Sequence, residues 1–186
     1  MTEILFFLAG ATALLLLVWA RRNYASFLAQ QPDDYVNRSP DFDMRQHLSG
    51  PLICEGILYG PLGRVNTRFV GKFHGQWSGN KGHLVEHFTY ESGAEQKREW
   101  FLTTKNDGTI EAEAPDVIGV GQGMQKGSAV LLNYRLKLEE SSGGHELDTT
   151  DWMYLLENGT IVNRSQMRKF GIKVAELVAT IRKADA

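Results

Sequence analysis

The chain opens with one long apolar stretch. Residues 4–20 contain no charged side chain and are bounded by Glu3 on one side and by Arg21 and Arg22 on the other. A helix of that length would extend roughly 26 Å, which approaches the thickness of a bilayer's hydrocarbon core. The stretch offers no polar face to water, as a helix on the surface of a soluble domain would. We therefore predict a membrane-spanning helix, with a buried helix of a soluble protein as the alternative.

The residues that flank this stretch predict its type and its orientation. A cleaved secretory signal would begin with basic residues and end at a small-residue cleavage site, whereas this segment begins with Glu3 and runs directly into two arginines. Trp19 beside those arginines is typical of an anchor at the membrane interface. Because basic residues follow the stretch and none precede it, the positive-inside rule predicts that the remainder of the chain is cytoplasmic.

The rest of the chain divides into a connector and a β-rich domain. Residues 1–22 form the predicted anchor, and residues 23–41 are polar, contain prolines and show no sustained periodicity, so we expect a juxtamembrane connector there. From residue 42 to residue 186, short alternating segments are separated by glycine-containing turns, which is the two-residue period of strands. About nine strands are expected, at residues 52–59, 67–77, 84–90, 96–104, 109–114, 129–138, 147–156, 160–168 and 172–181.

Consecutive strands with short connections predict an all-β fold. An antiparallel up-and-down barrel of the lipocalin or calycin kind is expected, because closure removes the sheet edges that would otherwise pair with other chains. The segment 173–182 also fits a helical period, so a helix is the alternative for the last element. The glycine-rich residues 119–123 lack the strand and helix of a nucleotide-binding loop, and we expect a flexible loop at the barrel mouth.

Composition excludes several classes of protein. The 20 basic residues against 22 acidic ones give a net charge of −2 without a concentrated positive region, which argues against nucleic-acid binding. The single cysteine, Cys54, excludes an internal disulfide and a thiolate metal cluster. His83 to His87 match the H-x-x-E-H pattern of zinc peptidases, but on a strand Glu86 would point away from both histidines, so we predict no metal site. No catalytic residue and no cofactor are predicted.

The most informative polar cluster lies on a predicted hairpin. If Asn158 and Gly159 form a two-residue turn, then Tyr154 lies opposite Asn163, and Met153 lies opposite Arg164. A polar side chain that points into a barrel requires a partner, either an acid such as Asp151 or a ligand. A structural polar network in the barrel wall, with the tryptophans as ordinary core, is the alternative. The predicted ligand-binding residues are Arg164, Asn163 and Asp151 at the polar end, with Trp77, Trp100, Trp152 and Tyr154 around the apolar part.

The order of several motifs resembles the bacterial family called domain of unknown function 3833, over residues 42–183. These motifs are Gly75-x-Trp77-x-Gly79, Leu84-x-Glu86-x-Phe88-x-Tyr90, Arg98-x-Trp100, Ala114-x-Asp116-Val117-x-Gly119, Asp151-Trp152-Met153-Tyr154 and Asn163-Arg164-x-x-Met167-x-Lys169-Phe170-Gly171. The resemblance implies a bacterial envelope protein, often encoded near enzymes that modify unsaturated or cyclopropane fatty acids, with no established catalytic residue.

The chain departs from this family at its start. Members resemble lipoproteins with a cysteine that closes the signal segment, whereas Leu8-Ala9-Gly10 is followed here by Ala11. Lipid attachment is therefore unavailable, and the predicted spanning helix replaces it. The family resemblance implies a periplasmic domain, in contrast to the cytoplasmic location predicted from the arginines, and both remain open for a single-pass protein of the bacterial inner membrane.

Three functions follow from these expectations. The first is a barrel, tethered to the bilayer through residues 4–20, that binds or presents a fatty-acyl or other apolar ligand. The second is an accessory enzyme of membrane fatty-acid modification that uses Asp151, His83 or His87 as an acid or base. The third is a non-catalytic envelope scaffold with a filled core. The protein partners are not specified by the sequence, and a hollow barrel would favour the first function over the third.

Overall fold

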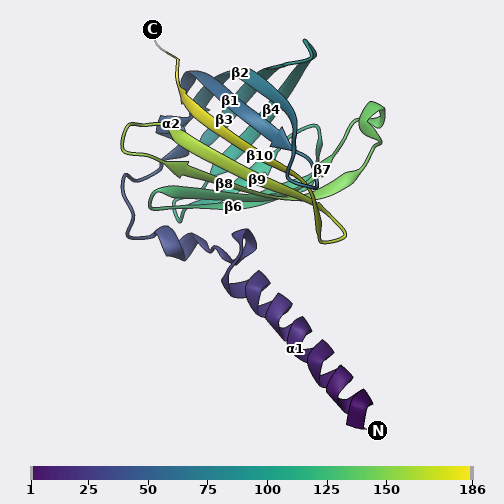
Figure 1. The fold of residues 1–186 in the computed structure, drawn as a ribbon. Helices are drawn as coiled ribbons and strands as arrows, with labels where there is room; N and C mark the ends of the chain where they lie inside the picture. Colours follow the sequence, from purple (N-terminus) through teal and green to yellow (C-terminus); the bar gives the residue numbers. More distant parts are fainter. Residues whose placement is uncertain (1, 185–186) are drawn as a thin grey trace.

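A computed structural model describes residues 2–184 and shows a closed barrel with a long helix extending from it (Figure 1). The helix α1 (Thr2–Tyr24) buries none of its side chains. Each strand pairs in antiparallel fashion with the next, and β1 pairs with β10 to close the barrel, which confirms the predicted fold class. The strands are β1 (Gly50–Tyr59), β2 (Val65–Ser78), β3 (Lys81–Tyr90), β4 (Glu95–Thr104), β5 (Thr109–Glu113), β6 (Val117–Lys126), β7 (Ala129–Lys137), β8 (Glu146–Leu155), β9 (Ile161–Lys169) and β10 (Ile172–Lys183).

Two local predictions are settled by this topology. The last element is the strand β10 and not a helix, since it pairs with both β1 and β9. The expected loop at residues 119–123 is wrong, because these residues belong to β6, which pairs with β5 and β7. A Cβ atom on Gly123 would lie 2.4 Å from the carbonyl oxygen of Leu131. At this position glycine therefore permits the close approach of a neighbouring strand, where the sequence suggested flexibility.

The hairpin between β8 and β9 has a longer turn than predicted. The amide of Leu156 donates to the carbonyl oxygen of Thr160 at 2.8 Å, so these two residues form the last pair and three residues make the loop. Gly159 takes a φ of 80°, the left-handed conformation found at the end of three-residue hairpin loops. A two-residue turn would have made Glu157 the partner of Thr160, and that prediction is wrong by one position.

The shift of one residue changes which side chains of β8 and β9 lie on the same face of the hairpin. Met153 lies opposite Asn163, and Trp152 lies opposite Arg164. Because successive strand residues alternate between the two faces, Asn163 points into the barrel with Met153, and Arg164 points outward with Trp152. The inward and outward side chains of β8 and β9 are therefore separated by the barrel wall.

A short helix closes one end of the barrel. The helix α2 (Met44–His47) begins after Asp43, whose carboxylate accepts a hydrogen bond from the amide of Arg45 and caps the helix. Met44 and Leu48 are buried in the core. A Cβ atom on Gly75 of β2 would lie only 1.7 Å from the carbonyl oxygen of Leu48, so glycine is required where this segment crosses the strand.

The connector between α1 and α2 packs on the outside of the barrel. It contains two short 3₁₀ helices, η1 (Phe27–Ala29) and η2 (Pro32–Tyr35). The ring of Tyr35 contacts Trp152 and Tyr154 of β8, with centroid separations of 5.3 and 5.5 Å. Lys126 pairs with Asp33, which fixes the connector to β6 as well. The connector is thus attached to the barrel wall over much of its length.

Candidate ligand cavity

The barrel encloses a cavity of about 120 Å³. Most of the side chains around it are apolar, and they come from nearly every strand and from α2. Near α2 the lining includes Met44, Leu48, Phe73 and Leu102, while Phe69, Phe88, Leu136, Met167 and Leu177 lie farther from it.

The cavity opens at the barrel end opposite α2. Inward side chains close to α2, such as Leu52 and Ile161, are almost completely buried. At the other end the inward side chains Phe88, Leu136 and Leu177 are only partly buried. The mouth is therefore framed by the β1–β2, β3–β4, β5–β6, β7–β8 and β9–β10 connections, which all lie at that end of the meander (Figure 1).

Polar and charged side chains gather on one part of the barrel interior and at its rim, and we call this group the polar belt: Glu86, Arg98, Asp116, Asp151, Asn163 and Ser165. An ion pair between Arg98 and Asp116 is part of it. Arg98 of β4 lies directly opposite Glu86 of β3. Its Nε donates to Asp116 Oδ2 at 2.7 Å, and its guanidinium carbon lies 4.2 Å from the ring centroid of Trp100. Within residues 2–184, the buried Nη2 of Arg98 has no hydrogen-bond partner. Arg98 also lines the cavity, so its guanidinium is a cationic group at the wall of the barrel interior.

The second part of the belt is a network around Asp151 of β8. Its Oδ1 accepts hydrogen bonds from Ser165 Oγ at 2.6 Å and from Asn163 Nδ2. Burial raises the pKa of Asp151, while the hydrogen bonds from Ser165 and Asn163 oppose that rise by favouring the ionised form. The sequence-predicted partnership of Asn163 with Asp151 is therefore present in the structure.

The carboxyl of Glu86 has a pKa in the neutral range. Burial raises its pKa from the ordinary value of 4.5 to about 7, against the attraction of Arg98. Both the protonated and the ionised forms of Glu86 are consequently accessible near neutrality. The belt holds three carboxyl groups, those of Glu86, Asp116 and Asp151, around the single guanidinium of Arg98.

The structure brings three of the seven predicted ligand-binding residues to the cavity. Asp151, Asn163 and Trp100 line it. Trp77 lies at the end closed by α2, where its Nε1 donates to the carbonyl oxygen of Leu48 at 3.3 Å. The three remaining residues, Arg164, Trp152 and Tyr154, are on the outer face of the barrel under the connector.

The outward placement of Arg164 follows from the three-residue turn described above. Its side chain donates to Glu176 of β10 at 2.6 Å and stacks over the ring of Phe27 at 4.9 Å. Tyr154 donates to Gln30 Oε1 at 2.7 Å, also within the connector. These residues hold the connector on the barrel wall, so any ligand contact by them would be outside the cavity.

The histidines considered as acids or bases lie outside the barrel. His83 stacks on Phe101 with a centroid distance of 4.8 Å and contacts Glu99 at 3.1 Å. His87 is exposed. The barrel wall therefore separates both histidines from Asp151.

Sequence reasoning missed Glu86, Arg98 and Tyr134 as cavity residues. A signal for the first two was present, since each shares the two-residue period of an apolar strand face. Glu86 alternates in register with Leu84 and Phe88, and Arg98 alternates with Trp100 and Leu102. A charged residue on the apolar face of a barrel strand is the pattern that identifies an interior ionisable group.

Residues 23–183 match the family described as "Protein of unknown function (DUF3833)". The chain belongs to this family. The resemblance drawn from the motifs is thereby confirmed, and the match includes the connector of this DUF3833 chain as well as the barrel. A search of curated proteins finds no relative.

Two solved structures are similar to this chain, and the first shares its barrel fold. The crystal structure of Rv2717c from M. tuberculosis is 14% identical, covers 80% of this chain and 100% of its own, and has a TM-score of 0.59. The redesigned barrel mFAP1, solved bound to DFHBI, is 16% identical, with coverage of 75% and 97% and a TM-score of 0.40. At these identities the similarity extends to the fold alone.

Proposed function

We propose that this protein binds a fatty-acyl or other apolar ligand inside its barrel, next to a membrane that holds α1. The observation that carries the proposal is the hollow interior, which is lined mainly by apolar side chains and contains the unpartnered Nη2 of Arg98. A concave apolar site with a few convergent polar groups is how small barrels hold ligands. A filled-core scaffold would leave no such cavity.

The size of the cavity limits how much of the ligand it encloses. Its volume of about 120 Å³ is close to that of an engineered cavity of ~150 Å³ that accommodates benzene. Pockets that enclose a whole drug-sized molecule are larger, roughly 300–1,000 Å³. We therefore expect one ring or a short acyl segment to enter the barrel, while the rest of the ligand extends through the mouth between Phe88 and Leu177.

The charges of the belt favour a neutral polar end. Arg98 offers a donor, but Glu86, Asp116 and Asp151 surround it with carboxyl groups, and a free carboxylate of the ligand would add a further negative charge. An ester or amide carbonyl oxygen accepts from Arg98 without that repulsion. The proposed ligand is accordingly an esterified or amidated acyl group, with Asp151 and Asn163 beside its polar end and Trp100 against its apolar part.

The helix α1 supports a location at a membrane. The helix α1 is long and apolar enough to cross a bilayer, and a signal sequence would meet the same criterion. Arg21 and Arg22 after the apolar segment support a retained single-pass anchor in the bacterial inner membrane. These arginines favour a cytoplasmic barrel, and the family resemblance favours a periplasmic one.

Ligand binding is tested with the full chain in detergent. Native mass spectrometry followed by solvent extraction should release a co-purifying lipid, and a fluorescent acyl ester should bind and be displaced by unlabelled ester. Leu177→Trp, which fills the cavity near its mouth, should weaken binding by at least about tenfold, as expected for loss of roughly 1.4 kcal/mol. Val178→Trp, on the exposed face of the same strand, is the matched control and should bind normally. Absence of both lipid and probe binding would refute the proposal.

A second candidate, an accessory enzyme of lipid modification, is favoured by Glu86. A carboxyl with a pKa of about 7 in a cavity is suited to proton transfer near neutrality. Glu86→Gln and Asp151→Asn should then change the fatty-acid profile of the cell while the variant proteins still bind the acyl probe. An unchanged fatty-acid profile in both variants would refute catalysis and leave ligand binding as the proposed function.

A further inference from the structure

The hairpin between β9 and β10 exposes apolar side chains at the barrel mouth. Phe170 is 91% exposed at the tip, where it takes a positive φ of 51°, and Ile172 is 70% exposed. Leu62, in the β1–β2 turn, is 87% exposed. Because β1 pairs with β10, the two turns lie at the same end of the barrel. Together Leu62, Phe170 and Ile172 form what we call the apolar tip.

Basic residues surround the apolar tip. Lys169 and Lys173 flank Phe170 and Ile172 directly, and Arg64 follows Leu62. Lys169 contacts Nδ1 of His145 at 2.9 Å, whereas Lys173 pairs with Glu176. Exposed apolar side chains beside lysines and arginines are typical of surfaces that contact the headgroup region of a bilayer.

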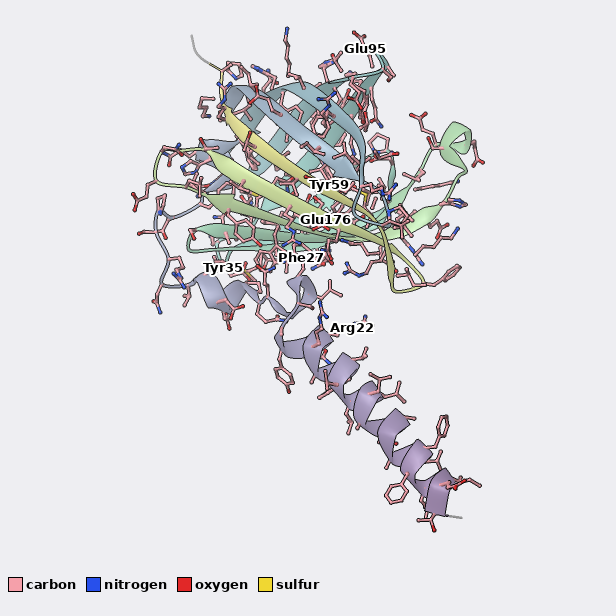
Figure 2. The ribbon with its side chains drawn as sticks, viewed as in Figure 1. Arg22, Phe27, Tyr35, Tyr59, Glu95 and Glu176 are labelled. Atoms are coloured by element: carbon pink, nitrogen blue, oxygen red, sulfur yellow. The ribbon has the colours of Figure 1, made fainter. Side chains whose placement is uncertain are left out.

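The residues that directly follow α1 contact the strand β9 of this hairpin. Phe27, which follows the helix, stacks under Arg164 of β9. Arg168, farther along β9 toward the tip, has a pKa lowered by burial and by the positive charge of Arg22. Figure 2 shows Arg22 and Phe27 at the junction of α1 with the barrel, with Glu176 of β10 nearby. A bilayer that held α1 would therefore have its surface close to the β9–β10 hairpin.

We propose that the apolar tip docks on the surface of the anionic bilayer that holds α1. Phe170, Ile172 and Leu62 enter the interfacial region, while Lys169 and Arg64 face phospholipid phosphates. The barrel mouth then faces the membrane, which gives an acyl ligand a short path from the bilayer to the cavity. The inference rests on the membrane anchoring included in the proposed function, but it does not depend on which ligand the cavity holds.

The test uses an environment-sensitive dye on a single exposed cysteine. Cys54 is buried, so a cysteine introduced by Ile172→Cys is the one that reacts in the folded chain. The matched control is Leu156→Cys, which is partly exposed at the opposite end of the barrel. Each labelled full chain is inserted into vesicles of equal parts phosphatidylcholine and phosphatidylglycerol that contain a quencher-bearing lipid. We expect quenching of the dye at position 172 and none at position 156.

Two further variants test the chemistry of docking in the Ile172→Cys background. Phe170→Asn keeps a residue that tolerates positive φ and should abolish most of the quenching. Lys169→Gln should lower the ratio of docked to undocked barrels by about fivefold, and vesicles of phosphatidylcholine alone should lower it further.

Three outcomes would overturn the docking proposal. The first is a dye at position 172 that is quenched no more than the dye at position 156. The second is equal, strong quenching at both positions, which indicates unspecific adsorption. The third is a signal that follows the protein-to-lipid ratio, which indicates that a second copy of the chain covers the tip. Binding of the acyl ester in detergent is measured separately, so failure of docking and failure of ligand binding are distinguishable.

Discussion

Replacing Glu86 by glutamine should stabilise the barrel in a pH-dependent manner. The carboxyl of Glu86 is buried in the polar belt, and burial raises its pKa to about 7 from the ordinary value of 4.5. Glutamine keeps the size of the side chain and its ability to hydrogen bond, but it cannot ionise. The variant therefore removes the cost of burying a negative charge and changes the packing little.

The sign and the size of the change in unfolding free energy follow from proton linkage. A carboxyl with a raised pKa holds its proton more tightly in the folded chain than in the unfolded chain. Between pH 4.5 and about 7 the unfolded chain loses this proton first, so the wild-type protein loses stability as the pH rises through that window. The difference between the two pKa values corresponds to about 3 kcal/mol of stability, which is fully present below pH 4.5 and fully lost above about pH 7.

The assay is urea unfolding of the detergent-solubilised full chain, followed by tryptophan fluorescence, at pH values below 4.5 and above 7. The free energy of unfolding of Glu86→Gln, minus that of the wild type, should increase by about 3 kcal/mol between the two conditions. Glu95→Gln, at the exposed start of β4 (Figure 2), is the control and should show a constant difference. A constant difference for Glu86→Gln as well would mean that Glu86 is not desolvated as described.

Three other changes test other parts of the structure. Gly75→Ala forces a Cβ atom to within 1.7 Å of the Leu48 carbonyl oxygen, so it should displace α2 and lower the free energy of unfolding by about 1–3 kcal/mol. An unchanged midpoint of thermal unfolding would contradict the packing of α2 against β2. Cys54 should resist maleimide in the folded chain and react completely in urea, as followed by mass spectrometry, because burial raises the pKa of its thiol. Arg164→Ala should cost at most about 1 kcal/mol, because the arginine is partly exposed, and should leave binding of the acyl ester unchanged. Weaker ester binding in Arg164→Ala would place Arg164 in the binding site.

The barrel was predictable from the sequence because its signal is repeated along the chain. The alternation from Thr67 to Trp77 identifies β2 without help from other segments, and nearly every strand adds a similar pattern. The strand β6 was missed because Gly119, Gly121 and Gly123 remove the side chains on which such patterns depend. At Gly121 and Gly123 the structural reason is the close approach of β5 and β7, which involves residues distant in the sequence and has no local signature, while Gly119 takes a positive φ of 72°.

The candidate site was predicted less completely, because adding one residue to a turn changes which side chains of a hairpin share a face. Asn158-Gly159 favours a two-residue turn, but the pairing of Leu156 with Thr160 includes Glu157 in the loop. The inward positions of Asp151 and Asn163 therefore exclude Arg164, although all three were expected together. The interior charge is instead supplied by Arg98 on β4, and only alternation with Trp100 distinguished it from surface arginines.

The same hairpin nevertheless serves both the cavity and the orientation of the barrel. On its inner face, β8 and β9 place Asp151 and Asn163 in the polar belt. On its outer face, Trp152 and Arg164 bind the connector and so fix where α1 leaves the barrel. With α2 closing the opposite end, the place where the connector meets β9 sets which way the open mouth is directed relative to α1. Trp152, Tyr154 and Arg164, which the sequence assigned to ligand binding, hold the connector on the barrel wall, and through it they would direct the mouth toward the proposed membrane surface.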